Sequence, residues 1–141
     1  MNITSLSLLN FRSYEKKSFQ FSPETTLIVG PNTAGKTNIL EAIFMMATGK
    51  SFRAELDREV VRWGEEMANA KCQMLNKDEE TALELFITQG EAQGAKAPLK
   101  KYLVNGVPRR MIDFVGNLRV VLFWPEDLEL VTDSPSLRRR Y

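Results

Sequence analysis

One stretch of this 141-residue sequence has residue types at a spacing that could bind a chain of phosphates. It fits the pattern G-x-x-x-x-G-K-[ST] without a mismatch and consists of Gly30, Pro31, Asn32, Thr33, Ala34, Gly35, Lys36 and Thr37. Its glycines let the backbone curve so that successive N–H groups point inward at a polyphosphate. In this pattern the lysine, Lys36, reaches the β- and γ-phosphates, and the hydroxyl of Thr37 coordinates Mg²⁺. The pattern therefore predicts a nucleoside triphosphate site in which Lys36 has the catalytic role and Thr37 holds the metal.

The residues on both sides of this loop have the periodicity that the motif requires. Residues 25–29 are β-branched and apolar, which predicts a strand that leads directly into Gly30. After Lys36, apolar residues recur at intervals of three and four, which predicts a helix that ends at Gly49. The N-terminus of that helix would add partial positive charge beside the phosphates. The alternative is a glycine-rich turn that merely ends a strand, and the flanking strand and helix favour phosphate binding over it.

The rest of the chain is predicted to be rich in β-structure. Alternating polar and apolar residues predict strands at 3–10 and around 19–21, and a hairpin at 70–75 and 81–88. Asn105-Gly106 predicts a tight hairpin turn, because both residues accept left-handed backbone geometry. Residues 89–98 are expected to form an exposed loop, and residues 118–124 a buried strand that Pro125 closes. We expect one domain of the α/β class.

Composition excludes several classes of function. The 19 basic and 18 acidic residues leave a net charge of +1, so the whole chain has no electrostatic bias towards nucleic acid. The sequence contains no histidine, which excludes catalysis by imidazole, and its single cysteine excludes an internal disulfide. No apolar run approaches the roughly 20 residues needed to span a bilayer. We expect no membrane association and a cytoplasmic location.

Acidic and basic clusters outside the loop each have two interpretations. Glu126 and Asp127 follow an apolar segment, as in the acidic pair that holds Mg²⁺ in related ATPases, but Pro125 removes them from the strand. A core strand followed by a polar turn is therefore favoured. The basic run 138–140 is interpreted as a solvated face rather than a phosphate-binding patch. A strip that faces DNA could be formed by Lys50, Arg53, Arg58 and Arg62, although acidic residues interrupt it.

The two tryptophans also have two interpretations. Trp63 and Trp124 could each be a flat surface on which a base stacks. Large aromatic side chains are more often part of a core, and that interpretation is favoured for both.

Several stretches of the sequence, taken together with the phosphate loop, resemble those of a known family. Asn10-Phe11-Arg12-Ser13-Tyr14 before the phosphate loop, with Gly35-Lys36-Thr37-Asn38 in it, resembles the ATP-binding head of the SMC-like ABC ATPases. The stretches at 47–53, 104–106, 121–128 and 134–140 are similar to the RecF family of bacterial recombination mediators. The resemblance covers nearly the whole chain. It implies the N-terminal lobe of an ABC/SMC-type P-loop ATPase head, with a mixed β-sheet around the phosphate-loop helix and an antiparallel β subdomain.

The resemblance implies function as well. It adds Arg12 and Asn38 to the ATP-binding residues, and it makes ATP and Mg²⁺ the expected cofactors. RecF-like proteins form ATP-dependent homodimers that act as clamps on DNA at single-strand gaps in repair, replication restart and the SOS response. They act with RecO and RecR to load RecA. Glu126 and Asp127 would lie near the lid that senses the γ-phosphate.

One departure from the family affects catalysis. The family also has a Ser-x-Gly-Gln signature loop and a strand that ends in Asp-Glu (Walker B), and residues 1–141 contain neither. The sequence is therefore expected to be a partial ATPase domain, with slow hydrolysis a property of the longer protein. Two alternatives stay open: a module that binds ATP and dimerises without significant hydrolysis, and another SMC-like ATPase such as an overcoming-lysogenisation-defect nuclease.

Overall fold

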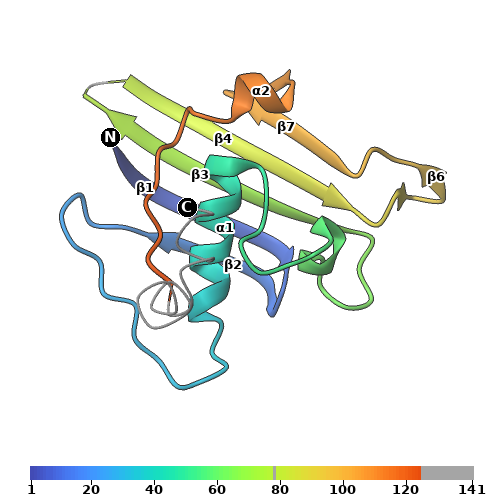
Figure 1. The fold of residues 1–141 in the computed structure, drawn as a ribbon, viewed down its shortest axis with the longest axis horizontal. Helices are drawn as coiled ribbons and strands as arrows, with labels where there is room; N and C mark the ends of the chain where they lie inside the picture. Colours follow the sequence, from blue (N-terminus) through green and yellow to red (C-terminus); the bar gives the residue numbers. More distant parts are fainter. Residues whose placement is uncertain (78, 125–141) are drawn as a thin grey trace, which may run out of the picture.

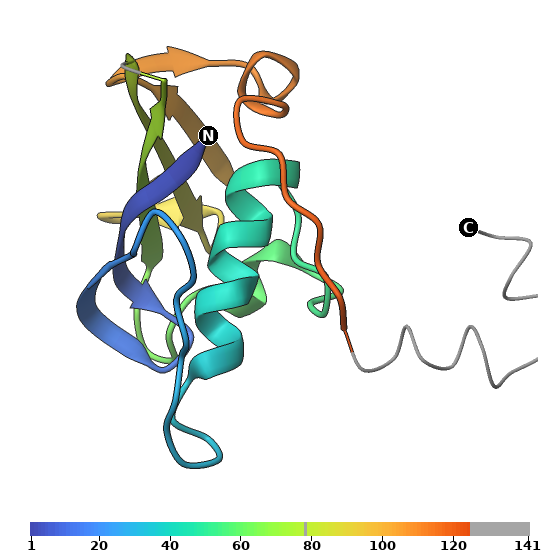
Figure 2. The same ribbon diagram turned by 90° about the vertical axis from the view of Figure 1, so that its left-hand side faces the viewer.

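The computed structural model describes residues 1–77 and 79–124, which form an antiparallel sheet with a helix on one face (Figure 1, Figure 2). The order of strands in the six-stranded sheet is β2-β1-β3-β4-β7-β8. Their bounds are β1 Asn2–Phe11, β2 Tyr14–Gln20, β3 Met67–Asn76, β4 Glu79–Thr88, β7 Lys100–Val104 and β8 Val107–Arg109. The strands predicted near the N-terminus and the hairpin of β3 with β4 are confirmed.

The core lies between this sheet and the helix α1 (Lys36–Thr48). Side chains alternate across a strand, so every second residue faces the helix. The register brings these buried residues into rows across the sheet: Leu6, Cys72 and Leu83 in one row, and Leu8, Ala70 and Leu85 in the next. From the helix, Ala42, Met45 and Met46 complete the core.

Helix α1 begins and ends as predicted, but its buried face differs from the predicted one. It ends at Gly49, whose φ of 74° suits glycine and whose N–H donates to Met45 O at 2.8 Å. Ile39, Leu40, Ile43, Phe44 and Ala47 form the predicted apolar stripe, yet Leu40 is 39% exposed. The face that is buried contains Glu41 instead. Because the helix has apolar residues around most of its circumference, periodicity alone could not define the side that packs on the sheet.

Small elements complete the fold. The Asn105-Gly106 hairpin is confirmed, with φ values of 51° and 76° at these two residues. Where an exposed loop was predicted at 89–98, strands β5 (Glu91–Ala92) and β6 (Ala95–Lys96) form a short hairpin. The other elements are a 3₁₀ helix, η1 (Asp57–Val60), and a one-turn helix, α2 (Met111–Phe114). Among the described residues, no helix combines the length and the apolar character that crossing a membrane requires.

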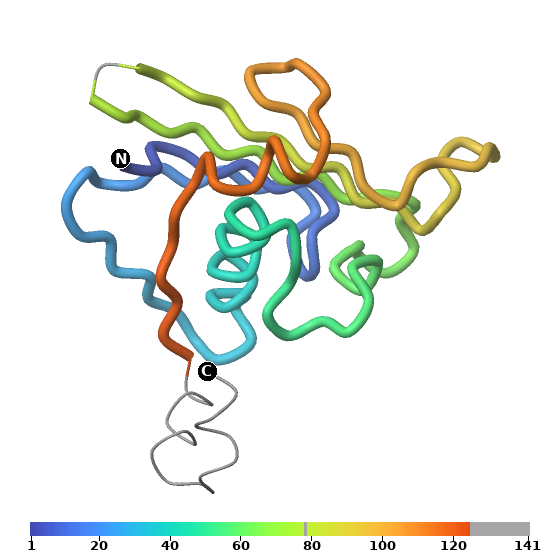
Figure 3. The backbone as a smooth tube through the Cα atoms, turned by 45° about the horizontal axis from the view of Figure 1, so that its top comes forward, coloured from blue at the N-terminus to red at the C-terminus, as the bar shows by residue number. Residues whose placement is uncertain are grey.

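Two predicted strands are absent from the sheet. Residues 25–29 and 118–124 have no regular secondary structure and pair with no strand in the described part of the chain. Segment 118–124 passes alongside α1 (Figure 3) and keeps the alternation of a strand: Leu118 is buried, whereas Val121 and Phe123 face outward. Leu27 and Val29 are also exposed, at 82% and 77%. The residue types in these segments favour an extended backbone, but a β-strand also needs a neighbouring strand with which to exchange hydrogen bonds.

Candidate functional site

The phosphate loop crosses from segment 25–29 to the first turn of α1, and its path requires glycine at one position. Gly35 is the N-cap of α1 and has a φ of 90°. A Cβ atom there would lie 2.8 Å from Tyr14 Oη and 2.9 Å from Ser13 Oγ, so a larger residue would collide with β2 and the turn before it. Thr33 also has a positive φ, whereas Ala34 does not, so alanine fits its place in the loop without backbone strain. The sequence pattern thus reflects a backbone path that only particular residues allow.

Lys36 holds the loop in a curve. Its ammonium group donates to Gly30 O and to Pro31 O, each at 2.7 Å. The loop and the start of α1 enclose a hollow of about 260 Å³, lined by Ser13, Asn32, Thr33, Gly35, Lys36, Thr37, Asn38 and Arg53. Most of the predicted site residues are therefore gathered in one place. A lysine ammonium at a helix N-terminus inside a curved loop is an arrangement suited to binding a polyanion.

Arg12 lies where β1 ends, and its guanidinium is already hydrogen-bonded. Its Nε and Nη2 donate to the two carboxylate oxygens of Glu41 at 2.9 and 2.6 Å, and its Nη1 donates to Glu59 O at 2.9 Å. The side chain is 21% exposed. These three bonds leave two of the five guanidinium N–H groups for another partner. Its role as a nucleotide ligand stays a prediction.

Glu41 is the centre of a buried charge network that the sequence did not reveal. Its side chain is fully buried on α1 and accepts hydrogen bonds from Arg12, Arg53 and Ser51. Burial by itself would raise the pKa of Glu41, but these hydrogen bonds outweigh it and hold the pKa below its ordinary value. The carboxylate therefore stays ionised between two arginines. The signal in the sequence was an acid inside an apolar helical run, which could have indicated a buried ion pair.

Arg53 connects this network to the phosphate loop. It donates to Glu41 Oε2 through Nε at 3.0 Å and through Nη2 at 2.7 Å, and Nη2 also donates to Asn38 Oδ1. Asn38 in turn donates to Ser13 Oγ at 2.9 Å. Since Asn38 follows Thr37, the chain of contacts fixes the residue next to the predicted metal ligand.

The structure does not bring the four predicted DNA-facing cations together as a free basic strip. Arg53 is held by Glu41, and Arg62 pairs with Glu15 at 3.0 Å. Arg58 lines a second hollow on the other side of Arg12. Acidic residues interrupt this set of cations in the sequence. In the fold, carboxylates from elsewhere in the chain also bind two of the four cations, Arg53 and Arg62.

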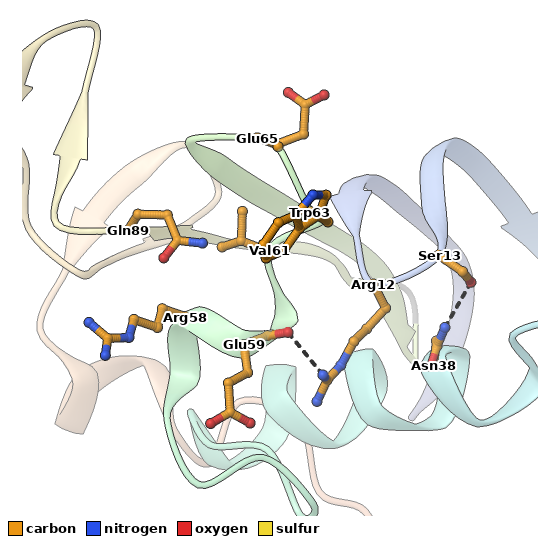
Figure 4. Close-up of a pocket in the computed structure, with 10 residues that line it drawn as sticks. Arg12, Ser13, Asn38, Arg58, Glu59, Val61, Trp63, Glu65 and Gln89 are labelled. Atoms are coloured by element: carbon orange, nitrogen blue, oxygen red, sulfur yellow. Dashed lines mark hydrogen bonds between the residues drawn. The ribbon is translucent and has the colours of Figure 1, made fainter.

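This second hollow, of about 870 Å³, shares Ser13 and Asn38 with the hollow at the phosphate loop, and Figure 4 shows the residues that line it. Its lining includes Arg12, Ser13, Asn38, Val61 and Trp63. Trp63 is 99% exposed, so the prediction that it belongs to the core is wrong. Trp124 is partly buried and packs on Phe52, with ring centroids 4.8 Å apart.

The described residues contain no group of three or more acidic, cysteine or histidine side chains arranged to hold a metal ion. Glu126, Asp127 and the basic run 138–140 lie outside the described residues. The coordination of Mg²⁺ by Thr37 stays a prediction. The loop does fit a phosphate group, because its curve brings the ammonium group of Lys36 to the N-terminus of α1.

Comparison with known proteins gives a family and several relatives. The family model described as an AAA domain matches residues 5–104. The DNA replication and repair protein RecF of Roseiflexus castenholzii is 41% identical over 152 residues, which take in all of this chain and 39% of that relative. The protein of the same name from Listeria welshimeri is 39% identical over 142 residues, covering 36% of its length. The chain thus spans less than two fifths of the length of these relatives.

Solved structures agree with the sequence comparison. The chain matches a structure of the recombination mediator protein RecF-ATPrS in the RecFOR pathway with a TM-score of 0.83 and 30% identity, over 99% of this chain and 36% of that one. A structure from work on ATP-driven dimerization and DNA-stimulated activation of SMC ATPases matches with a TM-score of 0.74 and 23% identity, over 98% and 95% of the two chains. The latter is a likeness of fold alone. The predicted fold class, the N-terminal lobe of an ABC/SMC-type ATPase head, is confirmed.

Proposed function

The chain belongs to the AAA-domain family and is homologous over its whole length to DNA replication and repair proteins named RecF, and from this we propose that its phosphate loop binds ATP. The observation that carries the proposal is the curved loop 30–37, with the ammonium of Lys36 inside it at the N-terminus of α1. Relatives solved as RecF-ATP and RecF-ATPrS support ATP as the nucleotide.

In this proposal the phosphate loop and the residues around it have distinct roles in binding ATP. The backbone N–H groups of the loop and of the first turn of α1 would donate to the phosphates. Lys36 would exchange its bonds with Gly30 O and Pro31 O for bonds to phosphate oxygens. The hydroxyl of Thr37 would hold Mg²⁺, which neutralises charge on the phosphates when bound. Asn38 and Arg12 would line the same site, fixed in place by Arg53 and Glu41 respectively.

For the longer protein we propose an ATP-gated clamp on DNA that acts in recombinational repair in the cytoplasm. Its ATP-dependent homodimer would close on DNA at single-strand gaps, with RecO and RecR as partners in loading RecA. The net charge of +1 and the pairing of Arg53 and Arg62 with carboxylates argue that this lobe by itself binds DNA weakly. Dimerisation would bring two lobes to the same DNA.

DNA binding by the complete protein is therefore expected to depend on ATP and to weaken as salt is raised, because phosphate contacts release counterions. The measurement is fluorescence anisotropy of a gapped duplex, with and without ATP, at two salt concentrations. A complete protein with Lys36→Ala is the control, and it should bind DNA equally weakly in both conditions. Equal affinity of the unaltered protein with and without ATP would contradict the clamp.

The 141-residue chain by itself is expected to hydrolyse ATP no faster than the background reaction. Thr37 would supply a single protein ligand to the metal, and no candidate general base is found among the described residues around the loop. Loss of a positioned base typically costs about 10²- to 10⁴-fold in rate. The measurement is phosphate release with Mg²⁺ and ATP. Turnover that disappears in Lys36→Ala and also in Glu126→Gln or Asp127→Asn would contradict this expectation and make the chain a complete enzyme.

A further inference from the structure

Trp63 exposes its whole indole ring beside the phosphate loop. The side chain is 99% exposed, although tryptophan is highly buried on average in folded proteins. It lines the second hollow, together with Val61 and Arg12 (Figure 4). An exposed ring at the wall of a hollow is available to a flat ligand.

The turn that carries Trp63 is firmly attached to the sheet. Segment 60–62 pairs with the end of β1: Arg12 N–H donates to Val60 O at 2.7 Å, and Arg62 N–H donates to Asn10 O at 2.8 Å. The turn itself is closed by Glu65 N–H, which donates to Arg62 O at 3.0 Å.

Two further features shape this turn. The third residue of the turn is Gly64, whose φ of 85° is a value that residues other than glycine rarely adopt. Asn10 Nδ2 also donates to Glu65 Oε2 at 3.0 Å, which binds the end of the turn to β1. Trp63 is therefore displayed by a fixed backbone next to Arg12, and not on a free loop.

The hollow beside Trp63 adjoins the phosphate-loop hollow. Ser13 and Asn38 line both of them, so the two share a wall. Lys36 and Thr37 line the part on the loop side, and Trp63 and Val61 line the part on the far side of Arg12. The volume of about 870 Å³ is within the range of about 300–1,000 Å³ that small-molecule sites occupy. A ligand with phosphates at one end and a flat ring at the other matches this arrangement.

We propose that the indole of Trp63 is the surface on which the base of the bound nucleotide stacks. This inference rests on the proposed binding of ATP phosphates by loop 30–37. It deepens that proposal by assigning the other end of the ligand to a residue outside the phosphate-loop motif. Stacking on an aromatic side chain tolerates any base, because every base has a π-face. Trp63 therefore contributes affinity for the nucleoside part, whereas Lys36 contributes affinity for the phosphates.

The test compares two probes, Mg-ATP and inorganic tripolyphosphate with Mg²⁺, in calorimetric titrations of the 141-residue chain. Trp63→Ala is expected to weaken ATP binding by about 5- to 150-fold, the range that base stacking contributes in other proteins. Its affinity for tripolyphosphate should be unchanged. Trp63→Phe should retain most of the ATP affinity, because it keeps an aromatic face.

Fluorescence gives a second readout and a matched control. In Trp124→Phe, emission comes from Trp63 alone, since the sequence has two tryptophans. ATP should quench this emission, and tripolyphosphate should not. In Trp63→Phe the remaining Trp124 packs on Phe52, and ATP should leave its emission nearly unchanged.

The possible outcomes separate this proposal from the proposed function. Equal ATP affinity in Trp63→Ala and the unaltered chain would overturn base stacking while leaving the phosphate site intact. Equal losses for ATP and tripolyphosphate would overturn it as well, because the ring would then act through the loop. In a third titration, with a single-stranded oligonucleotide, a loss of affinity in Trp63→Ala without any loss for ATP would assign the ring to a DNA base and refute the proposal. If neither probe binds the unaltered chain, the proposed function itself fails.

Discussion

Replacement of Lys36 by alanine is expected to weaken ATP binding by about 100-fold or more. The ammonium group would make charge-assisted hydrogen bonds to phosphate oxygens, each contributing about 1.5–3 kcal/mol. The loss of two such bonds removes at least about 3 kcal/mol, and every 1.4 kcal/mol corresponds to about tenfold in affinity. The fold should persist, because the Lys36 side chain bonds only to Gly30 O and Pro31 O among the described residues, and water can reach this exposed loop.

Calorimetric titration with Mg-ATP measures this effect directly. Lys50→Ala is the matched control, because Lys50 is an exposed lysine just beyond the opposite end of α1. The control should bind ATP as the unaltered chain does, and both variants should unfold at nearly the same temperature. An unchanged ATP affinity in Lys36→Ala would refute the assignment of loop 30–37 to phosphates.

Replacement of Glu41 by glutamine is expected to lower the free energy of unfolding by about 3–5 kcal/mol, the usual cost of removing one partner from a buried ion pair. The carboxylate is fully buried and accepts four hydrogen bonds from the guanidinium groups of Arg12 and Arg53 at 2.6 to 3.0 Å. The neutral amide would leave the two arginines without a counter-charge. Its NH₂ group would also point at one of these donors.

Urea unfolding of the two proteins measures the difference. Glu55→Gln serves as the control, because Glu55 is exposed and its replacement should change the free energy of unfolding by less than about 0.5 kcal/mol. A change of less than about 1 kcal/mol in Glu41→Gln would show that the network contributes little to stability.

The dependence of stability on pH offers a second test of the same network. The pKa of Glu41 is lower in the folded state than its ordinary value of 4.5, so the folded state binds this proton less readily than the unfolded state. The stabilisation is therefore fully present above the unfolded pKa and is lost as pH falls through the folded pKa. Below pH 4.5 the unaltered chain should lose stability more steeply than Glu41→Gln.

The phosphate loop could be predicted from sequence because its requirements are local. The left-handed backbone of Gly35 and the ammonium of Lys36 are each encoded by the residue itself. The Asn105-Gly106 hairpin was predictable for the same reason. Alternation in β1 and β3 indicated strands correctly, because both find partners within the described sheet.

The features that could not be predicted from the sequence all depend on contacts between residues that are far apart along the chain. Glu41 is satisfied by Arg12 and Arg53, which the fold brings to it from opposite directions along the sequence. Segment 25–29 has the composition of a strand, but it pairs with no strand among the described residues. Trp63 looked like a core residue because its type is usually buried, whereas the turn at Gly64 directs it into solvent.

The most direct test of phosphate binding by loop 30–37 is a crystal structure of the chain with Mg-ATP. We expect the β- and γ-phosphates to lie within hydrogen-bond distance of Lys36 Nζ and of the N–H groups at residues 33–37. The Lys36 ammonium should have left Gly30 O and Pro31 O, and Thr37 Oγ1 should coordinate the metal. A triphosphate bound elsewhere on the chain, with Lys36 still donating to those two carbonyls, would contradict the account.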